Sequence, residues 1–366
     1  MDFGAIFPLL SAKVSLKSFF IMKTVYSPKH NLRNPKTELA GGQLITPFES
    51  PQRADYILSA IQSQQLGPII APAQWPRSVV ESIHDIGYLS FLDTAWQRWT
   101  EAGNAGEAIP NIWQSRSMPS QRIPNHIDGQ LGYYSLAGET SISEGTTEAA
   151  WASTFVALSA ADLIHQGENS AFALCRPPGH HASKNQFGGY CFLNNAAIAA
   201  QKMLHDGAQK IAILDVDFHH GNGTQDIFYQ RNDVFYCSIH GDPMEAFPYF
   251  LGFSDEIGTG LGVDHNLNLP LQRGATFHIW HQALNHSLSK ICRFSPDALV
   301  ISLGVDTFEN DPISFFKLKS KDFTQMGKTI ASMNLPTLFI MEGGYAVEEI
   351  GTNTVNVLKG FKNEAA

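Results

Sequence analysis

Two carboxylates and two histidines follow a short apolar run in the segment IAILDVDFHHGNGTQ, residues 211–225. The run IAIL contains no polar residue, which is typical of a strand that is buried on both faces. Asp217 and His219 are two residues apart, so in extended backbone both side chains project to the same side. A carboxylate oxygen and an imidazole nitrogen are two of the three protein ligands of an open catalytic metal site. The alternative is an ordinary hydrogen-bonded pair in a turn at the end of the strand.

Four similar clusters follow other apolar runs of the chain. They are PPGHH at 177–181, HGDP at 240–243, GVDTF at 304–308 and EGGY at 342–345. The runs before them alternate with helical patterns, which predicts a parallel sheet with helices on both faces. Because ligands bind outside the carboxyl ends of the strands in such sheets, we expect the five clusters to share one site.

Asp306, in the cluster GVDTF, is the candidate for a third metal ligand; the alternative is the N-cap of a helix. Two carboxylates and one imidazole leave positions for water and substrate and suit Zn²⁺, although Fe²⁺, Co²⁺ and Mn²⁺ accept the same ligand types. Two carboxylates cancel the formal charge of the cation, which makes it a modest Lewis acid. Additional hydrogen-bond donors are then needed to stabilise an oxyanion.

Three further side chains are suited to moving protons or stabilising charge. His180 and His181 form the natural acid–base pair, unless backbone groups simply satisfy both rings. Tyr345 follows two glycines that let the backbone come close, so its hydroxyl could donate to a developing oxyanion. The segment Gly188–Gly189–Tyr190 fits a pocket wall, although Tyr190 fits the core equally well.

The elements that must position these residues start with a strand over 22–27. Further strands are expected at 171–176, 211–215, 233–239, 298–303 and 337–341. Helices are expected at 52–65, 77–100 with an interruption at Gly87, 146–167, 194–207, 224–231, 276–293, 320–333 and 352–362. Residues 101–130 are polar and without periodicity, and a loop of that length is usually functional or an oligomer contact.

Composition and charge narrow the class of protein. The 366 residues are 43% hydrophobic and 16% charged, so a substantial core is expected. Four widely spaced cysteines without a CxxC motif favour reduced thiols in the cytoplasm over a disulfide framework. The net charge of −9 disfavours nucleic acid as a partner and would attract a cationic ligand.

The first residues read as an extension. MDFGAIFPLLSAKVSLKSFF is interrupted by lysines and carries an acid at position 2, which predicts neither a signal peptide nor a membrane span. We therefore expect an N-terminal extension without assigned function over 1–21 and, since no linker-like break follows, one domain over 22–366.

The motifs RPPGHH, GGYCFLNNAA, DVDFHHGNGTQ, SLGVDTF and MEGGY resemble the zinc deacetylases of the arginase–deacetylase fold. HNLRNPKTEL, RIPNHIDGQLGYY, HGDPMEAFPYFLG and GVDTFENDPISFFKL are similar to the bacterial acetylpolyamine amidohydrolases rather than to histone deacetylases. The resemblance extends from about Met22 to the end. It implies a single-domain α/β fold with a central parallel β-sheet, and hydrolysis of acetylputrescine, acetylcadaverine or acetylspermidine.

The same resemblance implies roles for individual residues. One Zn²⁺ per subunit would be held by Asp217, His219 and Asp306. His181 would be the general base on a water molecule, and His180, hydrogen-bonded to Asp215, its electrostatic partner. Tyr345 would complete the oxyanion stabilisation.

Other implied roles lie around this centre. Tyr190 and Phe247 would form the walls of a narrow tunnel. Asn222 stands where many histone deacetylases have an aspartate, so a neutral amide would orient His181. A structural K⁺ would be held by oxygens of Asp215, Asp217, His219, Ser238 and Ile239.

The resemblance also implies a homodimer in which the 101–130 loop closes the site across the interface. Asp128 and Glu139 lie where acidic residues would meet the distal ammonium of the substrate; otherwise they are surface carboxylates. A lysine deacetylase acting on protein is the first alternative. An arginase-like ureohydrolase with two Mn²⁺ would need more ligands than DVDFHHG supplies, and a catalytically inactive binding module would be expected to lack a ligand or the tyrosine.

Overall fold

The chain folds around one sheet of eight strands, and the computed structural model describes residues 21–118 and 122–364. Of the extension expected at 1–21, residues 1–20 lie outside this description. The strand order is β4-β1-β5-β10-β9-β6-β7-β8, and every neighbouring pair is parallel. The strands are β1 (Lys23–Val25), β4 (Ile69–Ile70), β5 (Ser170–Ala173), β6 (Ile211–Asp215), β7 (Val234–Gly241), β8 (Asn266–Leu271), β9 (Ala298–Leu303) and β10 (Thr337–Met341). The predicted fold class is confirmed.

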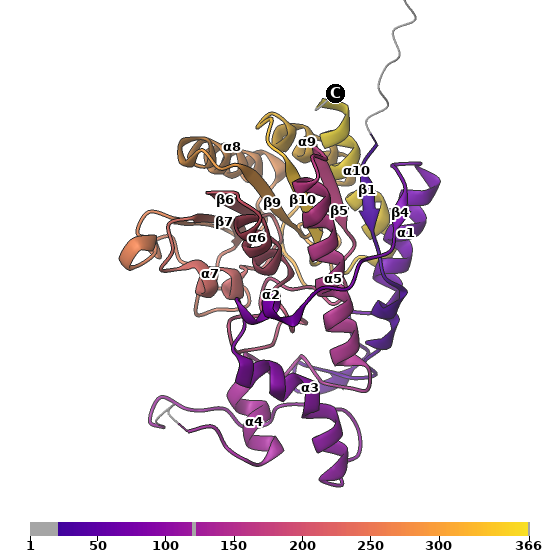
Figure 1. Ribbon diagram of the computed structural model, residues 1–366, viewed down its shortest axis with the longest axis vertical. Helices are drawn as coiled ribbons and strands as arrows, with labels where there is room; N and C mark the ends of the chain where they lie inside the picture. The colour runs from indigo at the N-terminus through magenta and orange to yellow at the C-terminus, as the bar shows by residue number, and fades with distance from the viewer. Residues whose placement is uncertain (1–20, 119–121, 365–366) are drawn as a thin grey trace, which may run out of the picture.

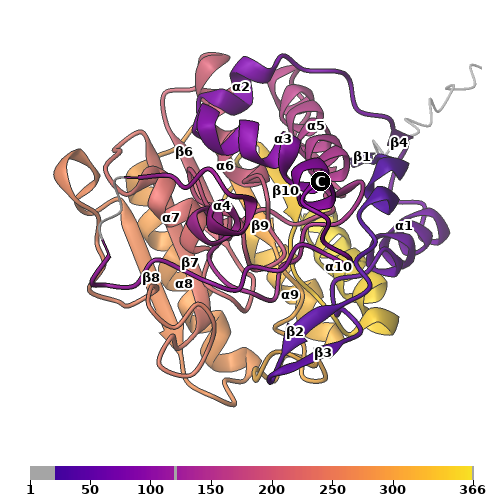
Figure 2. The same cartoon turned by 90° about the horizontal axis from the view of Figure 1, so that it is seen from below.

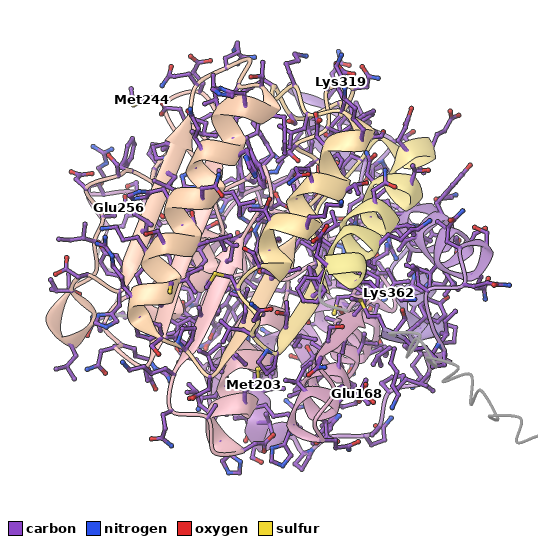
Figure 3. All side chains as sticks on the ribbon, turned by 90° about the horizontal axis from the view of Figure 1, so that it is seen from above. Glu168, Met203, Met244, Glu256, Lys319 and Lys362 are labelled. Carbon is purple, nitrogen blue, oxygen red and sulfur yellow. The ribbon has the colours of Figure 1, made fainter. Side chains whose placement is uncertain are left out.

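Helices cover both faces of the sheet because alternate side chains of each strand point to opposite sides. Ile211 and Ile213 of β6 belong to a core with α3 (Ile86–Glu101), α5 (Thr146–His165) and α6 (Asn195–His205). Ala212 and Leu214 belong to a second core with α1 (Gln52–Ser63), α8 (Phe277–Phe294), α9 (Ser320–Ala331) and α10 (Val347–Glu364). Figure 3 looks onto this second face, where the gold and yellow helices lie in front of the strands.

The carboxyl ends of the strands face the part of the molecule that holds α3 and α4 (Ile127–Tyr134). α10 begins shortly after β10 and runs to Glu364, and Figure 1 shows it running toward the end of the molecule opposite α3 and α4. Viewed from that lower end, α4 lies in front of the sheet (Figure 2). The remaining elements are the hairpin β2 (Glu38–Ala40) and β3 (Gln43–Ile45), the helices α2 (Arg77–Glu81) and α7 (Asn222–Phe228), and the 3₁₀ turns Pro28–Leu32 and Gly260–Gly262.

The predicted interruption of the 77–100 helix at Gly87 is wrong. The helix breaks between Glu81 and Ile86, and Gly87 lies in the first turn of α3. Tertiary contacts hold the break, because the backbone N–H of Asp85 donates to the Lys184 carbonyl over 2.9 Å and the His84 ring accepts the Asn194 N–H over 2.9 Å. Gly87 was the strongest helix-breaking residue in the 77–100 segment, but contacts with residues 184 and 194 decide where the helix breaks.

The sequence patterns also missed several short elements. The two edge strands β4 and β8 and the β2–β3 hairpin were not predicted. The first of these strands has two residues, and the second contains Pro270, which is tolerated at the edge of a sheet. The polar stretch 101–130 is irregular in the residues described, except that α3 ends in it at Glu101 and α4 begins within it at Ile127.

Candidate functional site

A cavity of about 370 Å³ lies where the loops after the strands meet. Tyr190, Phe247, Phe315 and Tyr345 contribute aromatic walls, and His181 and His219 also line it. These side chains come from the loops that follow five different strands, or from segments that continue those loops. The sheet therefore brings the predicted clusters together at one edge, as expected for an open parallel sheet.

Asp217, His219 and Asp306 converge on one point. Their potential ligand atoms lie within 4.8 Å of one another, and both carboxylates are fully buried. The strand predicted over 211–215 is confirmed as β6, but the backbone bends over 217–219 and lacks the extended geometry from which we paired Asp217 with His219. Within this bend, the N–H of Phe218 donates to Asp306 Oδ1 over 2.8 Å, and the N–H of His219 donates to Asp217 Oδ1 over 2.9 Å. These bonds fix two of the three side chains.

The surroundings of this group fit a divalent metal. A Cβ atom at Gly304 would lie 2.0 Å from Asp217 Oδ2, and one at Gly343 would lie 2.5 Å from the same oxygen. Only glycine therefore lets both loops come so close to the carboxylates. Two buried carboxylates beside a single imidazole leave negative charge that a cation would balance. Two oxygens and one nitrogen are a donor set that Zn²⁺ accepts.

His180 and His181 lie side by side above this group, with ring centroids 4.0 Å apart. His180 Nδ1 is 3.0 Å from Asp215 Oδ2, and His181 Nδ1 is 2.7 Å from Asn222 Oδ1. Gly189 packs against the His181 ring, since a Cβ atom there would lie 2.2 Å from it. One histidine thus has a carboxylate partner and the other has an amide partner.

The two histidines are driven to opposite protonation states. Burial lowers the pKa of His180, but the carboxylates of Asp217 and Asp215 outweigh burial and raise this pKa to about 10. Burial also lowers the pKa of His181, and the neighbouring His180 adds to the effect, so this pKa lies well below its usual range. Asn222 cannot offset this with a negative charge. His180 is therefore the charged ring and His181 the neutral ring that can accept a proton.

Tyr345 is held at the cavity by contacts that the sequence did not reveal. Its backbone N–H donates to Asp311 Oδ2 over 2.7 Å, and its ring lies 4.8 Å from the Arg53 guanidinium. Arg53 also donates to the carbonyls of Glu342 and Gly344, each over 2.6 Å. Burial raises the pKa of Asp311 to about 6 and that of the Tyr345 hydroxyl well above 10. The hydroxyl is therefore protonated near neutral pH and available as a donor.

Glu342 holds the backbone of the loop that carries His180 and His181. Its carboxylate accepts the backbone N–H groups of Gly179 and His180 over 2.6 and 3.2 Å. Burial raises the pKa of Glu342 to about 7. Glu342 lay within the predicted cluster EGGY, but no sequence pattern pointed to this supporting role.

A buried ion cluster lies behind Arg53. Arg176 binds Glu49 through two contacts of 2.7 and 3.1 Å, and Arg53 binds the same carboxylate over 3.1 Å. Burial raises the pKa of Glu49, but the charges of Arg176, Arg53 and Arg33 outweigh it and hold this pKa below its usual value. The cluster joins α1 to the loops that carry the site.

Glu49→Gln is expected to destabilise the protein by about 3–5 kcal/mol, because it leaves two buried guanidinium groups without their counter-charge. The free energy of unfolding in urea measures this. Glu168→Gln is the matched control, since Glu168 pairs with Lys23 over 2.7 Å at positions that are 33% and 36% exposed. That change should cost no more than about 1 kcal/mol. A comparable loss in both variants would contradict the role given to the cluster.

The proposed substrate-binding residues separate into two groups. Glu139, Tyr190 and Phe247 line the cavity, and Phe247 packs edge-on against His181 at 5.0 Å between ring centroids. Asp128 does not line it among the described residues of a single chain. It lies in the first turn of α4, with its side chain 41% exposed and 3.5 Å from His126.

Three of the residues expected at a K⁺ site, Asp215, Ser238 and Ile239, lie on the neighbouring strands β6 and β7. Asp215 of β6 is in register with Ser238 of β7 and with Ser302 of β9, and all three are fully buried. The Ser302 hydroxyl has no hydrogen-bond partner among the described groups. Ser238 Oγ lies 2.7 Å from His240 Nδ1, and Ile239 follows it in β7.

Comparison with known proteins places this geometry in context. Residues 47–361 match the histone deacetylase domain family. The acetylpolyamine amidohydrolase of Mycoplana ramosa is 57% identical over 339 residues, which cover 93% of this chain and 99% of that protein. Acetylpolyamine amidohydrolase 1 of Pseudomonas aeruginosa is 52% identical over 345 residues, covering 94% of this chain and 100% of the relative.

A solved structure is similar over nearly the whole chain. The crystal structure of the acetylpolyamine aminohydrolase from Burkholderia pseudomallei superposes with a TM-score of 0.89 at 37% identity, covering 94% of this chain and 99% of its own. Among the residues described here, no helix has the length and apolar character needed to cross a membrane.

Proposed function

The chain belongs to the histone deacetylase domain family, in its acetylpolyamine amidohydrolase branch, and from this premise we propose that it hydrolyses the acetamide of N-acetylated polyamines to a free amine and acetate. Acetylputrescine, acetylcadaverine and acetylspermidine are the proposed substrates. The observation that carries the proposal is the convergence of Asp217, His219 and Asp306 with a histidine pair and Tyr345 around one aromatic cavity. The catalytic domain is assigned to residues 22–366.

We assign one Zn²⁺ per chain to Asp217, His219 and Asp306, on the basis of their donor set and of the glycines that let the loops approach it. When bound, this ion supplies Lewis-acid polarisation of the acetamide carbonyl and activation of a water molecule. The remaining steps belong to the side chains of the chain itself.

His181 is the proposed general base. With its Nδ1–H donated to Asn222 Oδ1 over 2.7 Å, Nε2 carries the free lone pair that accepts a proton from the attacking water. The same nitrogen can return this proton to the amine as it leaves. His180, whose Nδ1 lies 3.0 Å from Asp215 Oδ2, is the proposed electrostatic partner of His181 beside the reacting group. Tyr345 donates its hydroxyl to the negative charge that develops on the acetamide oxygen.

A structural K⁺ is proposed beside the site, held by oxygens of Asp215, Asp217, His219, Ser238 and Ile239. The partnerless Ser302 hydroxyl next to Asp215 supports an oxygen-lined position there. Potassium, like other hard cations, is held by oxygen ligands.

We further propose a homodimer, in which the 101–130 segment of one chain approaches the cavity of the other. Support comes from large apolar side chains on this segment that are 38–55% exposed in the single chain: Ile112, Trp113, Met118 and Ile123. Exposed apolar patches of this kind commonly mark protein interfaces. A second chain would also give Asp128 a route to the substrate. The molecular mass of the protein in solution tests whether the dimer forms.

We also propose a cytoplasmic location, which the four free cysteines fit.

A substrate panel tests the proposed function. kcat/KM of the Zn²⁺-loaded protein is measured on acetylputrescine, acetylcadaverine and acetylspermidine, against a peptide that contains acetyl-lysine. We expect a clear preference for the polyamines. Preference for the peptide would favour the alternative, a lysine deacetylase acting on protein, and turnover of none of them would favour a binding module.

Glu139→Gln is expected to lower kcat/KM for acetylputrescine about tenfold more than for N-butylacetamide, its neutral counterpart. Glutamine keeps an oxygen that can accept the Gly189 N–H, now 2.7 Å from Glu139, but it removes the charge that an ammonium group would meet. The exposed Glu144, changed to glutamine, is the control. Equal losses on both substrates would mean that Glu139 shapes the wall without recognising the ammonium.

A further inference from the structure

The mouth of the cavity carries an ion pair that the proposed reaction does not use. Arg273 Nε donates to Glu245 Oε2 over 2.8 Å, and both side chains line the cavity. They are 62% and 43% exposed, whereas Tyr345 and His219 in the same cavity are buried. Figure 3 places Met244, the neighbour of Glu245, at the periphery of the molecule, at the same end as Lys319. This rim pair, Glu245 and Arg273, therefore marks the solvent end of the cavity.

The loops of the rim are joined by contacts other than the rim pair. The N–H of Asp242 donates to the Leu271 carbonyl over 2.9 Å, and Gln272 Nε2 donates to Asp242 Oδ2 over 2.5 Å. On the other side, the N–H of Gly274 donates to the Phe315 carbonyl over 3.1 Å. Loss of either charge should therefore leave the walls of the cavity in place.

Within the rim pair, the cation that contacts Glu245 can be exchanged for another. A single hydrogen bond joins two exposed side chains, and such pairs are held weakly. The Arg273 guanidinium also lies over the Phe315 ring, 4.4 Å from its centroid. It can leave Glu245 and still be supported by the ring, because an aromatic face attracts a cation. A substrate ammonium, which is compact and carries the same charge, can then take its place on Glu245.

Two carboxylates lie at different depths of the cavity. Glu139 is bonded to the N–H of Gly189, which packs against the His181 ring, so it belongs to the inner part. Glu245 belongs to the rim. An acetylpolyamine with one ammonium group needs only one of them, whereas a longer chain with two ammonium groups can use both.

On the basis of the proposed function, we propose that the rim pair selects substrates by their number of positive charges. Glu245 binds the outer ammonium of a multiply charged chain such as acetylspermidine, and Arg273 is the resident cation that this ammonium displaces. Until this exchange is made, Arg273 competes with the outer ammonium for Glu245 and repels it, whereas a chain with one ammonium group needs no exchange.

The two variants Glu245→Gln and Arg273→Gln test this because they should act in opposite directions. The quantity measured is the ratio of kcat/KM for acetylspermidine to that for acetylputrescine. Glu245→Gln should lower this ratio about fivefold, and Arg273→Gln should raise it about threefold, both mainly through KM and both less at high salt. Arg293→Gln, an exposed arginine near the far end of α8, should leave the ratio unchanged.

A purely structural pair would behave differently. It would lower kcat/KM for both substrates in both variants, since either change breaks the same contact. Such equal losses, or an unchanged ratio in both variants, would overturn the proposal for the rim pair. The proposed function would still stand if the wild-type protein turned over acetylputrescine. Wild-type protein that turns over neither substrate would overturn both.

Discussion

Asp306→Asn is expected to abolish zinc binding and to lower kcat by a factor of at least about 10³. Asp306 contributes one of the two carboxylates that converge with His219, and its replacement halves the negative charge facing the cation. An asparagine keeps an oxygen for the Phe218 N–H that Asp306 Oδ1 now accepts over 2.8 Å, so the bend should survive. Zinc content per chain and turnover of acetylputrescine measure the two effects.

Thermal unfolding separates loss of the metal from loss of the fold. In wild-type protein, a ligand that binds only the folded state adds about 4 kcal/mol when present at 1,000 times its dissociation constant. The Asp306→Asn variant should gain nothing from added zinc. Without metal its stability should be close to that of metal-free wild type, because an amide oxygen can still accept the Phe218 N–H that Asp306 accepts now.

Asp255→Asn is the control, as an exposed aspartate outside the cavity. It should keep both the metal and the thermal response to zinc. A variant at 306 that bound a full equivalent of zinc and kept a tenth of the activity would show that Asp306 is not a ligand.

The clusters after the strands could be predicted because each carries its own local signal. An apolar run followed by Gly, His and Asp identifies both the strand and its functional end, and the parallel sheet then joins the clusters without further information. This is why the sequence alone could place Asp217 and Asp306, 89 residues apart in the chain, in one site. The backbone after the strand could not be predicted as well, since a bend over 217–219 takes the place of the extended geometry from which Asp217 and His219 were paired.

The supporting residues could not be predicted in the same way. Glu49 lies three residues before α1 and Arg53 lies in its first turn, where charged residues are ordinarily exposed. Their burial and their contacts with Arg176 and with the Tyr345 loop depend on packing between segments that are up to about 290 residues apart. Asp311 lies in the segment GVDTFENDPISFFKL, but only the fold shows that it accepts the Tyr345 N–H.

The rim pair could not be recognised as functional from the sequence for another reason. Arg273 and Glu245 are charged residues in polar turns, which is the ordinary composition of a surface. Only their shared position at the mouth of the cavity distinguishes them. Asp128 illustrates the reverse case, in which the resemblance to a family suggested a role that a single chain does not bring to the cavity.

Tyr345→Phe is expected to lower kcat by about 10²–10³ with little change in KM or in zinc content, as loss of one oxyanion donor does elsewhere. In the proposed reaction, two carboxylate ligands would leave a bound metal a weak Lewis acid, so the hydroxyl would be needed where charge develops on the acetamide oxygen. Phenylalanine keeps the ring, and with it the contacts to Arg53 at 4.8 Å and to Tyr190 at 5.5 Å. The backbone bond to Asp311 does not involve the side chain and should also persist.

The effect can be assigned to the hydroxyl by comparison with a second tyrosine of the same cavity. Tyr249 lines the cavity but is 51% exposed, and Tyr249→Phe should change kcat by less than about threefold. If Tyr345→Phe lost zinc or unfolded at a lower temperature, the hydroxyl would have a structural role instead. A loss confined to KM would assign it to ground-state binding, because only an interaction made in the transition state lowers kcat and kcat/KM together.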